Sequence, residues 1–204
     1  MSAVEAILTS LFEPWVGVAC LDDEQARFER GRACARLALE RLGGPAVQVG
    51  VGQDGEPLWP EGWVGSISHA SAFSVAAVAR LVDARALGVD VEPDLEVSPA
   101  FARRVCSDAE LARIGELGSR PEELARVVFS AKETVHKLQF PLTREGAGLR
   151  RIQVLLEDQR FVATFTESLP PFHAGQVLHG RWRRHAGVIG TAAWLSAALA
   201  AQIF

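Results

Sequence analysis

The chain has 204 residues, of which 49% are hydrophobic and 23% are charged, and its formal net charge is −4 at pH 7. This composition is typical of a globular protein that forms one domain or two small lobes, and it argues against general disorder. The negative charge argues against a broad nucleic-acid-binding surface, because such surfaces are strongly basic.

The first half is predicted to contain one helix followed by strands. Apolar residues at helical spacing predict a helix over residues 24–42, which Gly43-Gly44 ends. Alternation and apolar runs then predict strands, interrupted by a turn-rich stretch at 52–62: residues 46–51, 67–79 and 86–91. We expect the last two runs to form a buried strand pair joined around Asp83, and the segment between Pro93 and Pro99 to be a connector.

The second half is predicted to repeat this order. A helix is expected over residues 121–139, closed by Phe140-Pro141. Four strand candidates follow it, at residues 151–156, 161–165, 180–184 and 187–195. The pattern predicts two α+β lobes, residues 1–95 and 96–204, with the functional site in a cleft between them. A single irregular α+β domain is the alternative.

Several other features favour a soluble, cytoplasmic protein. The N-terminus has no basic segment followed by an apolar run, so we expect no signal peptide. Residues 188–204 are apolar but too short and interrupted for a membrane span. The three cysteines are scattered without metal-ligand spacing, as in reduced cytosolic proteins. Residues 50–55 match G-x-G-x-x-G, but Glu56-Pro57 follows where a dinucleotide site needs a helix, so we predict a plain loop.

The lysines are concentrated in one segment. Of the 21 lysine and arginine residues only Lys132 and Lys137 are lysines, in the segment Phe129-Ser-Ala-Lys-Glu-Thr-Val-His-Lys137. This distribution suggests a site that needs a compact ammonium group, not a planar guanidinium. On the expected helix the polar face carries Arg126, Ser130, Glu133 and Lys137, so an acid lies beside the lysine. An ordinary surface ion pair between Glu133 and Lys137 is the alternative.

Two acidic residues alternate along a predicted buried strand, Gly88-Val89-Asp90-Val91-Glu92. The two-residue period places Asp90 and Glu92 on the same face. Adjacent carboxylates repel each other and resist burial, and a divalent cation relieves that cost. Oxygen ligands of this kind suit Mg²⁺. A strand end that runs into solvent is the alternative.

Two further segments carry groups that bind phosphate oxygens. In Gly65-Ser-Ile-Ser-His69, the pair Ser68 and His69 can donate hydrogen bonds from a strand edge, although an ordinary turn would have the same residues. Arg32 and Arg36 on the first helix can bind a phosphate, although a solvated helix face is the alternative. A carboxylate pair, an acid–base group and phosphate donors together indicate phosphoryl-type transfer.

These segments resemble the signatures of the 4′-phosphopantetheinyl transferases of the surfactin/enterobactin-synthetase type. Gly88–Glu92 matches the family's G-[IV]-D-[IV]-E strand, and Phe129–Lys137 matches its [FW]-S-x-K-E-x-x-x-K helix. Gly65–His69 precedes both in the expected order. The segments Gly31–Arg36 and Gly55–Pro60 are similar to the enterobactin and mycobacterial branch, whose members serve secondary metabolism such as siderophore synthesis.

The resemblance implies a pseudo-twofold fold of two similar α/β lobes with coenzyme A (CoA) between them. It implies transfer of phosphopantetheine from CoA to a serine of an apo acyl or peptidyl carrier protein, with release of 3′,5′-ADP. It also implies a monomer that binds neither nucleic acid nor membrane. A CoA- or carrier-binding protein without catalysis, and a Mg²⁺-dependent nucleotide phosphohydrolase, are the alternatives.

The resemblance also implies roles for individual residues. Asp90, Glu92 and Glu133 would bind Mg²⁺, and Glu133 would take the serine proton. Lys137 would hold the diphosphate. The remaining phosphate contacts of CoA would come from Arg32, Ser68, His69 and Lys132. Because carrier proteins present acidic helices, Arg103, Arg104 and Arg113 are expected at the carrier surface. Many family members have a basic residue in or before the G-x-P loop, where this chain has Val51, Asp54 and Glu56.

Overall fold

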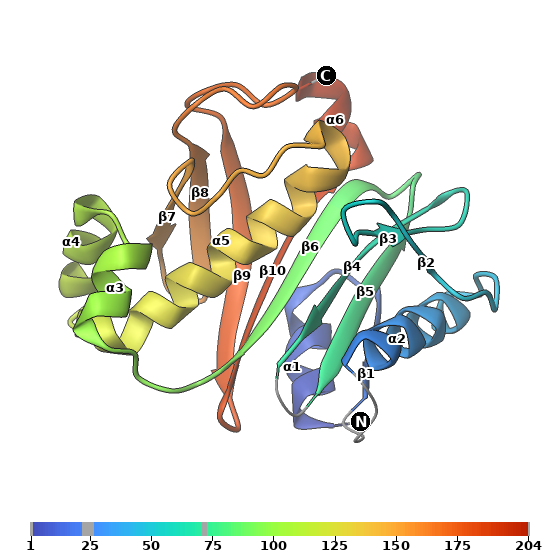
Figure 1. Ribbon diagram of the computed structural model, residues 1–204, viewed down its shortest axis with the longest axis horizontal. Helices are drawn as coiled ribbons and strands as arrows, with labels where there is room; N and C mark the ends of the chain where they lie inside the picture. The colour runs from blue at the N-terminus through green and yellow to red at the C-terminus, as the bar shows by residue number, and fades with distance from the viewer. Residues whose placement is uncertain (1, 22–26, 71–72, 204) are drawn as a thin grey trace.

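The computed structural model describes residues 2–21, 27–70 and 73–203 (Figure 1). Its strands form two larger antiparallel sheets of unequal size and one two-stranded sheet, with helices packed against the larger two. The expected α+β class is confirmed. Within the described residues, no helix is both long and apolar enough to cross a membrane.

The smaller sheet has three strands in the order β1 (Gly17–Leu21), β5 (Ser74–Arg80) and β4 (Trp63–His69). Helix α2 (Arg27–Arg41) packs on it through small side chains, including Ala35 and Ala38, which meet Ala76 and Val78. Small residues let the helix approach closely, and a side chain at Gly17 would lie 2.7 Å from the Ala38 carbonyl oxygen. A short hairpin of β2 (Gly50–Val51) and β3 (Pro57–Leu58) borders this sheet.

The larger sheet has five strands, and helix α5 (Pro121–Thr143) crosses one face of it (Figure 1). Helices α3 (Pro99–Val105) and α4 (Asp108–Glu116) lie beside the edge strand β7 (Ile152–Leu156) of this sheet. Helix α1 (Ala3–Leu11) packs through Ile7, Leu8 and Leu11 beside Gly190, and α6 (Ala197–Ile203) ends the described chain. The strand order is β6 (Ala84–Pro93), β10 (Val188–Ser196), β9 (Val177–His185), β8 (Arg160–Phe165) and β7 (Ile152–Leu156).

Helix α5 and strand β6 lie against each other in a regular register. Four helical residues rise about 6 Å and two strand residues about 6.8 Å, so the two elements stay nearly in step. Arg126 accordingly meets Glu92, and Ser130 meets Asp90. One step further, Gly88 lies so close to the helix that a Cβ atom there would be 2.0 Å from the Thr134 carbonyl oxygen. The glycine of the strand motif therefore brings the helix and its polar residues close to the acidic strand.

The structure corrects the expected pairing of the first-half strands. The apolar run 67–79 is a hairpin that contains the end of β4 and most of β5, and residues 71–72 lie outside the described chain. Strand β5 does not pair with the next strand, β6, which forms hydrogen bonds with β10 in the larger sheet. These bonds cross the predicted boundary between residues 95 and 96. The division into two similar lobes stays a prediction.

Other differences concern short elements. The strand expected over 46–51 covers only Gly50–Val51, and β1 was not anticipated. The expected connector is followed by α3 and α4, which begin after the capping residues Ser98 and Ser107. Pro141 lies inside α5 and does not end it; the helix ends at Thr143, and the next residue, Arg144, has a left-handed backbone conformation. Serine followed three residues later by glutamate at Ser107 is a capping signal that the sequence contained.

Candidate active site

Asp90 is the centre of a buried polar cluster between the two sheets. Its Oδ2 accepts a hydrogen bond from Ser130 Oγ at 2.7 Å, and its Oδ1 accepts bonds from Ser68 Oγ and Lys137 Nζ, each at 2.7 Å. The Lys137 ammonium also donates to Ser68 Oγ at 2.9 Å. Strand β4, strand β6 and helix α5 thus meet at one carboxylate. These contacts bring together three residues that the sequence predicted: Ser68, Asp90 and Lys137.

Glu92 and Glu133 flank this cluster. Glu92 Oε2 accepts a hydrogen bond from Arg126 Nη1 at 3.1 Å. Burial raises the pKa of Glu92, and the charge of Asp90 raises it further, while Arg126 and Lys137 oppose the shift. Burial likewise raises the pKa of Glu133, followed by the charge of Asp90, while Lys137 opposes it. Each carboxylate therefore lies within the field of the others, and their charges are only partly neutralised.

The donor set suits Mg²⁺ in its chemistry but not in its present arrangement. Among the residues that the structure describes, no three acidic, histidine or cysteine side chains surround a common point. Lys137 and two serines hold Asp90, and Arg126 holds Glu92. Mutual repulsion among buried carboxylates is the condition that a divalent cation relieves. Binding an ion here would require Asp90 and Glu92 to exchange at least part of their present contacts.

A cavity of about 540 Å³ opens beside Lys137. Its size is typical of small-molecule sites. On one side it is lined by β4 and by the turn between β2 and β3, and on the other by the second half of α5 and the loop after it. The lining residues include Gly55, Glu56, Ser66, Ile67, His136, Lys137, Phe140 and Arg144. The cavity thus extends from Lys137 of the Asp90 cluster to the turn of the β2–β3 hairpin.

Arg32 reaches this hairpin from α2. Its Nη2 donates to the Gly55 carbonyl oxygen at 3.4 Å, and its guanidinium lies 4.7 Å from the centre of the Phe28 ring. The side chain is buried, which lowers its pKa, and its Nε has no hydrogen-bond partner within the described chain. His69, by contrast, is exposed at the end of β4. The structure places Arg32 at the cavity's lining turn, and the phosphate roles of Arg32 and His69 stay predictions.

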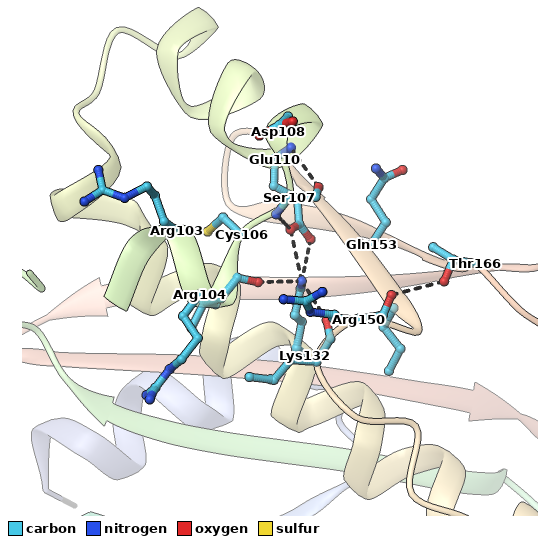
Figure 2. A pocket seen from close by; sticks show the side chains of 13 residues that line it. Arg103, Arg104, Cys106, Ser107, Asp108, Glu110, Lys132, Arg150, Gln153 and Thr166 are labelled. Carbon is cyan, nitrogen blue, oxygen red and sulfur yellow. Dashed lines mark hydrogen bonds and ion pairs between the residues drawn. The ribbon is translucent and has the colours of Figure 1, made fainter. Parts of the chain in front are cut away.

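Lys132 does not join the cluster. Two residues on a helix correspond to a rotation of about 200°, so Lys132 points away from the side of α5 that carries Ser130. Its side chain is 3% exposed, and its ammonium donates to Val105 O at 2.8 Å, Leu149 O at 2.9 Å and Glu110 Oε2 at 3.0 Å (Figure 2). Three acceptors use all three N–H groups, so these contacts do not support the expected role of Lys132 on CoA phosphates.

Glu110 completes this second cluster. Its carboxylate also accepts the backbone N–H groups of Ser107 and Val154, each at 2.6 Å. The lysine and the glutamate therefore tie α4, the end of α3, the loop before β7 and β7 itself to α5. Figure 2 shows Arg103 and Arg104 extending away from this ion pair. Both are exposed, whereas Arg113 donates to the Leu156 carbonyl oxygen and pairs with Glu116.

Three residues of the site, Arg126, Ser130 and Thr191, have no predicted functional role. Ser130 and Arg126 were placed on the polar face of the helix, but their partners Asp90 and Glu92 are about 35 to 40 positions away. Thr191 of β10 links Ser130 at 2.9 Å to Thr134 at 2.6 Å through its hydroxyl group. The helical period predicts that Ser130 and Arg126 lie on the same helix face as Lys137, whereas no sequence pattern near Thr191 predicts its contacts with α5.

Comparison with known proteins matches both halves of the chain. Residues 20–79 match the N-terminal domain of 4′-phosphopantetheinyl transferases, and residues 86–189 match the 4′-phosphopantetheinyl transferase superfamily. The 4′-phosphopantetheinyl transferase Svp of Streptomyces mobaraensis is 38% identical over 173 residues, which cover 81% of this chain and 70% of Svp. PptT of Mycobacterium tuberculosis is 33% identical over 172 residues, covering 79% and 74%. Enterobactin synthase component D of Salmonella typhi is 36% identical over 114 residues, covering 52% and 44%.

Proposed function

The chain belongs to the 4′-phosphopantetheinyl transferase superfamily, and we propose that the Asp90 cluster is the centre at which it transfers phosphopantetheine from CoA to a carrier serine. The expectation that the protein is such a transferase is confirmed by these comparisons. The proposal concerns the residues, the metal ion and the leaving group.

In the proposed reaction, the serine oxygen of the carrier attacks the phosphorus atom that bears pantetheine. A new P–O bond forms, the diphosphate bond of CoA breaks, and 3′,5′-ADP leaves with the electron pair of that bond. Asp90, Glu92 and Glu133 would hold Mg²⁺, which neutralises charge on the diphosphate when it is bound. Glu133 takes the serine proton, directly or through water. Burial and neighbouring carboxylates raise its proton affinity, as a general base requires.

The cations and hydroxyl groups of the site position the diphosphate. Lys137 lies where the cavity meets the acidic cluster, and 26% of its side chain is exposed. Its ammonium donates to Asp90, to Ser68 and, at 3.3 Å, to the Val89 carbonyl oxygen, so a diphosphate oxygen would replace the long bond to Val89. Ser68 orients both Asp90 and Lys137. Arg32 approaches from the other side of the lining turn with an unused N–H group, which suits a phosphate oxygen.

One observation carries the proposal: Asp90, Lys137 and Ser68, which come from three separate elements, meet beside a cavity large enough for part of CoA. The alternative, an ordinary surface ion pair, would not involve buried side chains from two strands and a helix. Phosphoryl transfer depends mainly on positioning and charge neutralisation, and a cation held beside the cavity by two strands and a helix supports the proposal on both counts.

The test uses purified protein, CoA, Mg²⁺ and a panel of apo acyl and peptidyl carriers. Mass spectrometry should show the gain of one phosphopantetheine group on the serine of at least one carrier. Asp90→Asn and Glu133→Gln should both abolish transfer. Asp90→Asn removes a proposed metal ligand, and Glu133→Gln removes both a proposed metal ligand and the proposed base. Glu122→Gln removes the same charge near the start of α5 and should transfer normally.

Three results would contradict the proposal. Normal turnover by Asp90→Asn or Glu133→Gln would remove these residues from the mechanism. Nucleotide release from CoA in the absence of any carrier would indicate a phosphohydrolase. Binding of CoA without modification of any carrier would indicate a protein that has lost the reaction. Circular dichroism of each variant should confirm folding, since the Asp90 side chain is buried and pairs with Lys137.

A further inference from the structure

An ion pair joins the two sides of the cavity at its outer end. Glu56 lies on the turn between β2 and β3, and Arg144 is the first residue after α5. The Arg144 Nη1 group donates to Glu56 Oε1, and both residues line the cavity that contains Lys137. Glu56 belongs to the part of the chain before the larger sheet and Arg144 to the part after α5, so the pair spans the opening.

The two partners differ in how firmly they are held. The Glu56 side chain is 12% exposed, and its second oxygen accepts the Asp54 N–H at 3.1 Å. The carboxylate is folded over Gly52, where an added Cβ would lie 2.1 Å from the carboxyl carbon. The Arg144 side chain is 58% exposed, although its backbone is anchored by an N–H bond to Phe140 O at 2.9 Å. Glu56 is therefore fixed to its turn, and the Arg144 guanidinium can change partners.

We propose that Arg144 binds a phosphate group of CoA, and that Glu56 competes with this phosphate as an internal counter-ion. The inference rests on the proposed function, because it assumes that CoA occupies this cavity. A guanidinium binds phosphate through two parallel hydrogen bonds, which are stronger than those of an exposed ion pair. The phosphate thus gains more from Arg144 than the protein loses when the pair with Glu56 opens.

The charges around the cavity support this assignment. Burial lowers the pKa of His136, followed by the charge of Lys137, so the imidazole favours its neutral form. The charged side chains among the lining residues are then Lys137 and Arg144, opposed by Asp54 and Glu56. Lys137 lies at the inner end, where it pairs with Asp90. Arg144 is consequently the cation that the outer end of the cavity presents to a polyanionic ligand.

If Glu56 and the phosphate compete for Arg144, substitutions of Arg144 and Glu56 should change the affinity for CoA in opposite directions. Arg144→Gln removes the cation and should weaken CoA binding about tenfold, as the loss of a charge-assisted contact does. Glu56→Gln frees the guanidinium and should tighten CoA binding about two- to fivefold, the range of a weak surface pair. Isothermal titration of CoA at one fixed Mg²⁺ concentration measures both. Arg151→Gln, which removes a half-buried arginine that pairs with Glu167 at 3.2 Å and does not line the cavity, should leave the affinity unchanged.

Two further ligands identify the group that Arg144 holds. If it is the 3′-phosphate, Arg144→Gln should leave the affinity for 3′-dephospho-CoA unchanged. If it is the diphosphate, the affinities for CoA and 3′-dephospho-CoA should fall together, while the affinity for pantetheine stays the same. Either pattern supports the proposal.

Equal weakening of CoA binding by Glu56→Gln and Arg144→Gln would show that the pair is only a structural bridge, and it would overturn the proposal. No effect of Arg144→Gln, or an equal loss for pantetheine, would overturn it as well. If the wild-type protein itself does not bind CoA, the proposed function fails together with this inference. If it binds CoA and Arg144→Gln binds equally well, only this inference fails. Thermal melting of each variant verifies the fold.

Discussion

Lys132 and Lys137 lie on the same helix and invite the same substitution, but the structure predicts opposite consequences. Lys132→Met leaves Glu110 buried without its cation, and it leaves the Val105 and Leu149 carbonyl oxygens without their donor. Lys137→Met removes the cation beside the cavity and leaves Asp90 with its two serine contacts. The first change should therefore reduce stability, and the second should reduce CoA binding.

The magnitudes follow from burial. Removing one member of a buried ion pair costs about 3–5 kcal/mol, because the other charge stays buried and uncompensated. Glu110 keeps two backbone N–H donors but loses its only cation among the described contacts, and Lys132 is 3% exposed. A loss of about 4 kcal/mol is a large fraction of the 5–15 kcal/mol typical of folded domains. Lys137 is 26% exposed, and its partner Asp90, which is 6% exposed, keeps two serine donors, so the removal of Lys137 should cost less, about 1–3 kcal/mol.

Urea unfolding and CoA titration of both variants form the assay. Lys132→Met should lower the unfolding midpoint by roughly 2 M while CoA affinity stays within about twofold. The double variant Lys132→Met/Glu110→Gln should recover about 2 kcal/mol, because it removes the stranded charge. Unchanged stability of Lys132→Met together with a large loss of CoA affinity would refute this reasoning and restore the role on the CoA phosphates.

Two other predictions concern α5. Burial lowers the pKa of His136 in the folded protein, so the unfolded state binds more protons; stability should fall as pH drops through the unfolded value of about 6.5. His136→Gln should remove this part of the pH dependence between pH 7.5 and 5.5, and an unchanged dependence in urea unfolding would argue against it. Gly88→Ala should cost about 3 kcal/mol and reduce transfer, because the added methyl group collides with the Thr134 carbonyl oxygen. Gly115→Ala meets no atom within 4 Å and should stabilise the protein by about 0.5 kcal/mol; equal effects of both glycine substitutions in calorimetry would contradict the packing argument.

Local patterns were enough to predict the family and which polar residues share a face of one strand or helix. A two-residue period placed Asp90 and Glu92 on one strand face, and a helical period placed Ser130, Glu133 and Lys137 on one helix face. The ordered motifs then indicated the family, which the matches at residues 20–79 and 86–189 confirm. These inferences succeeded because each depends on residues within a few positions of one another, where strand and helix geometry is nearly fixed.

Local patterns did not predict which strands pair or which sheet each strand belongs to. The sequence placed β6 beside β5, its neighbour along the chain, but the structure pairs it with β10, about a hundred positions later. Both strands are almost entirely buried, so their apolar runs do not distinguish one buried neighbour from another. The partner is decided by which pairing lets α1 and α5 cover the apolar surfaces of the same sheet.

The amino-acid sequence alone determined the family, the acidic strand and the polar helix face, because these follow from short-range periodicity and residue type. Only the tertiary structure decided that Lys132 belongs to a buried pair with Glu110, that Ser130 and Arg126 hold the two strand carboxylates, and that Arg144 meets Glu56 across the cavity. Each of these contacts joins residues between 22 and 88 positions apart. Such contacts depend on how helices and sheets pack, and periodicity along the chain carries no information about that packing.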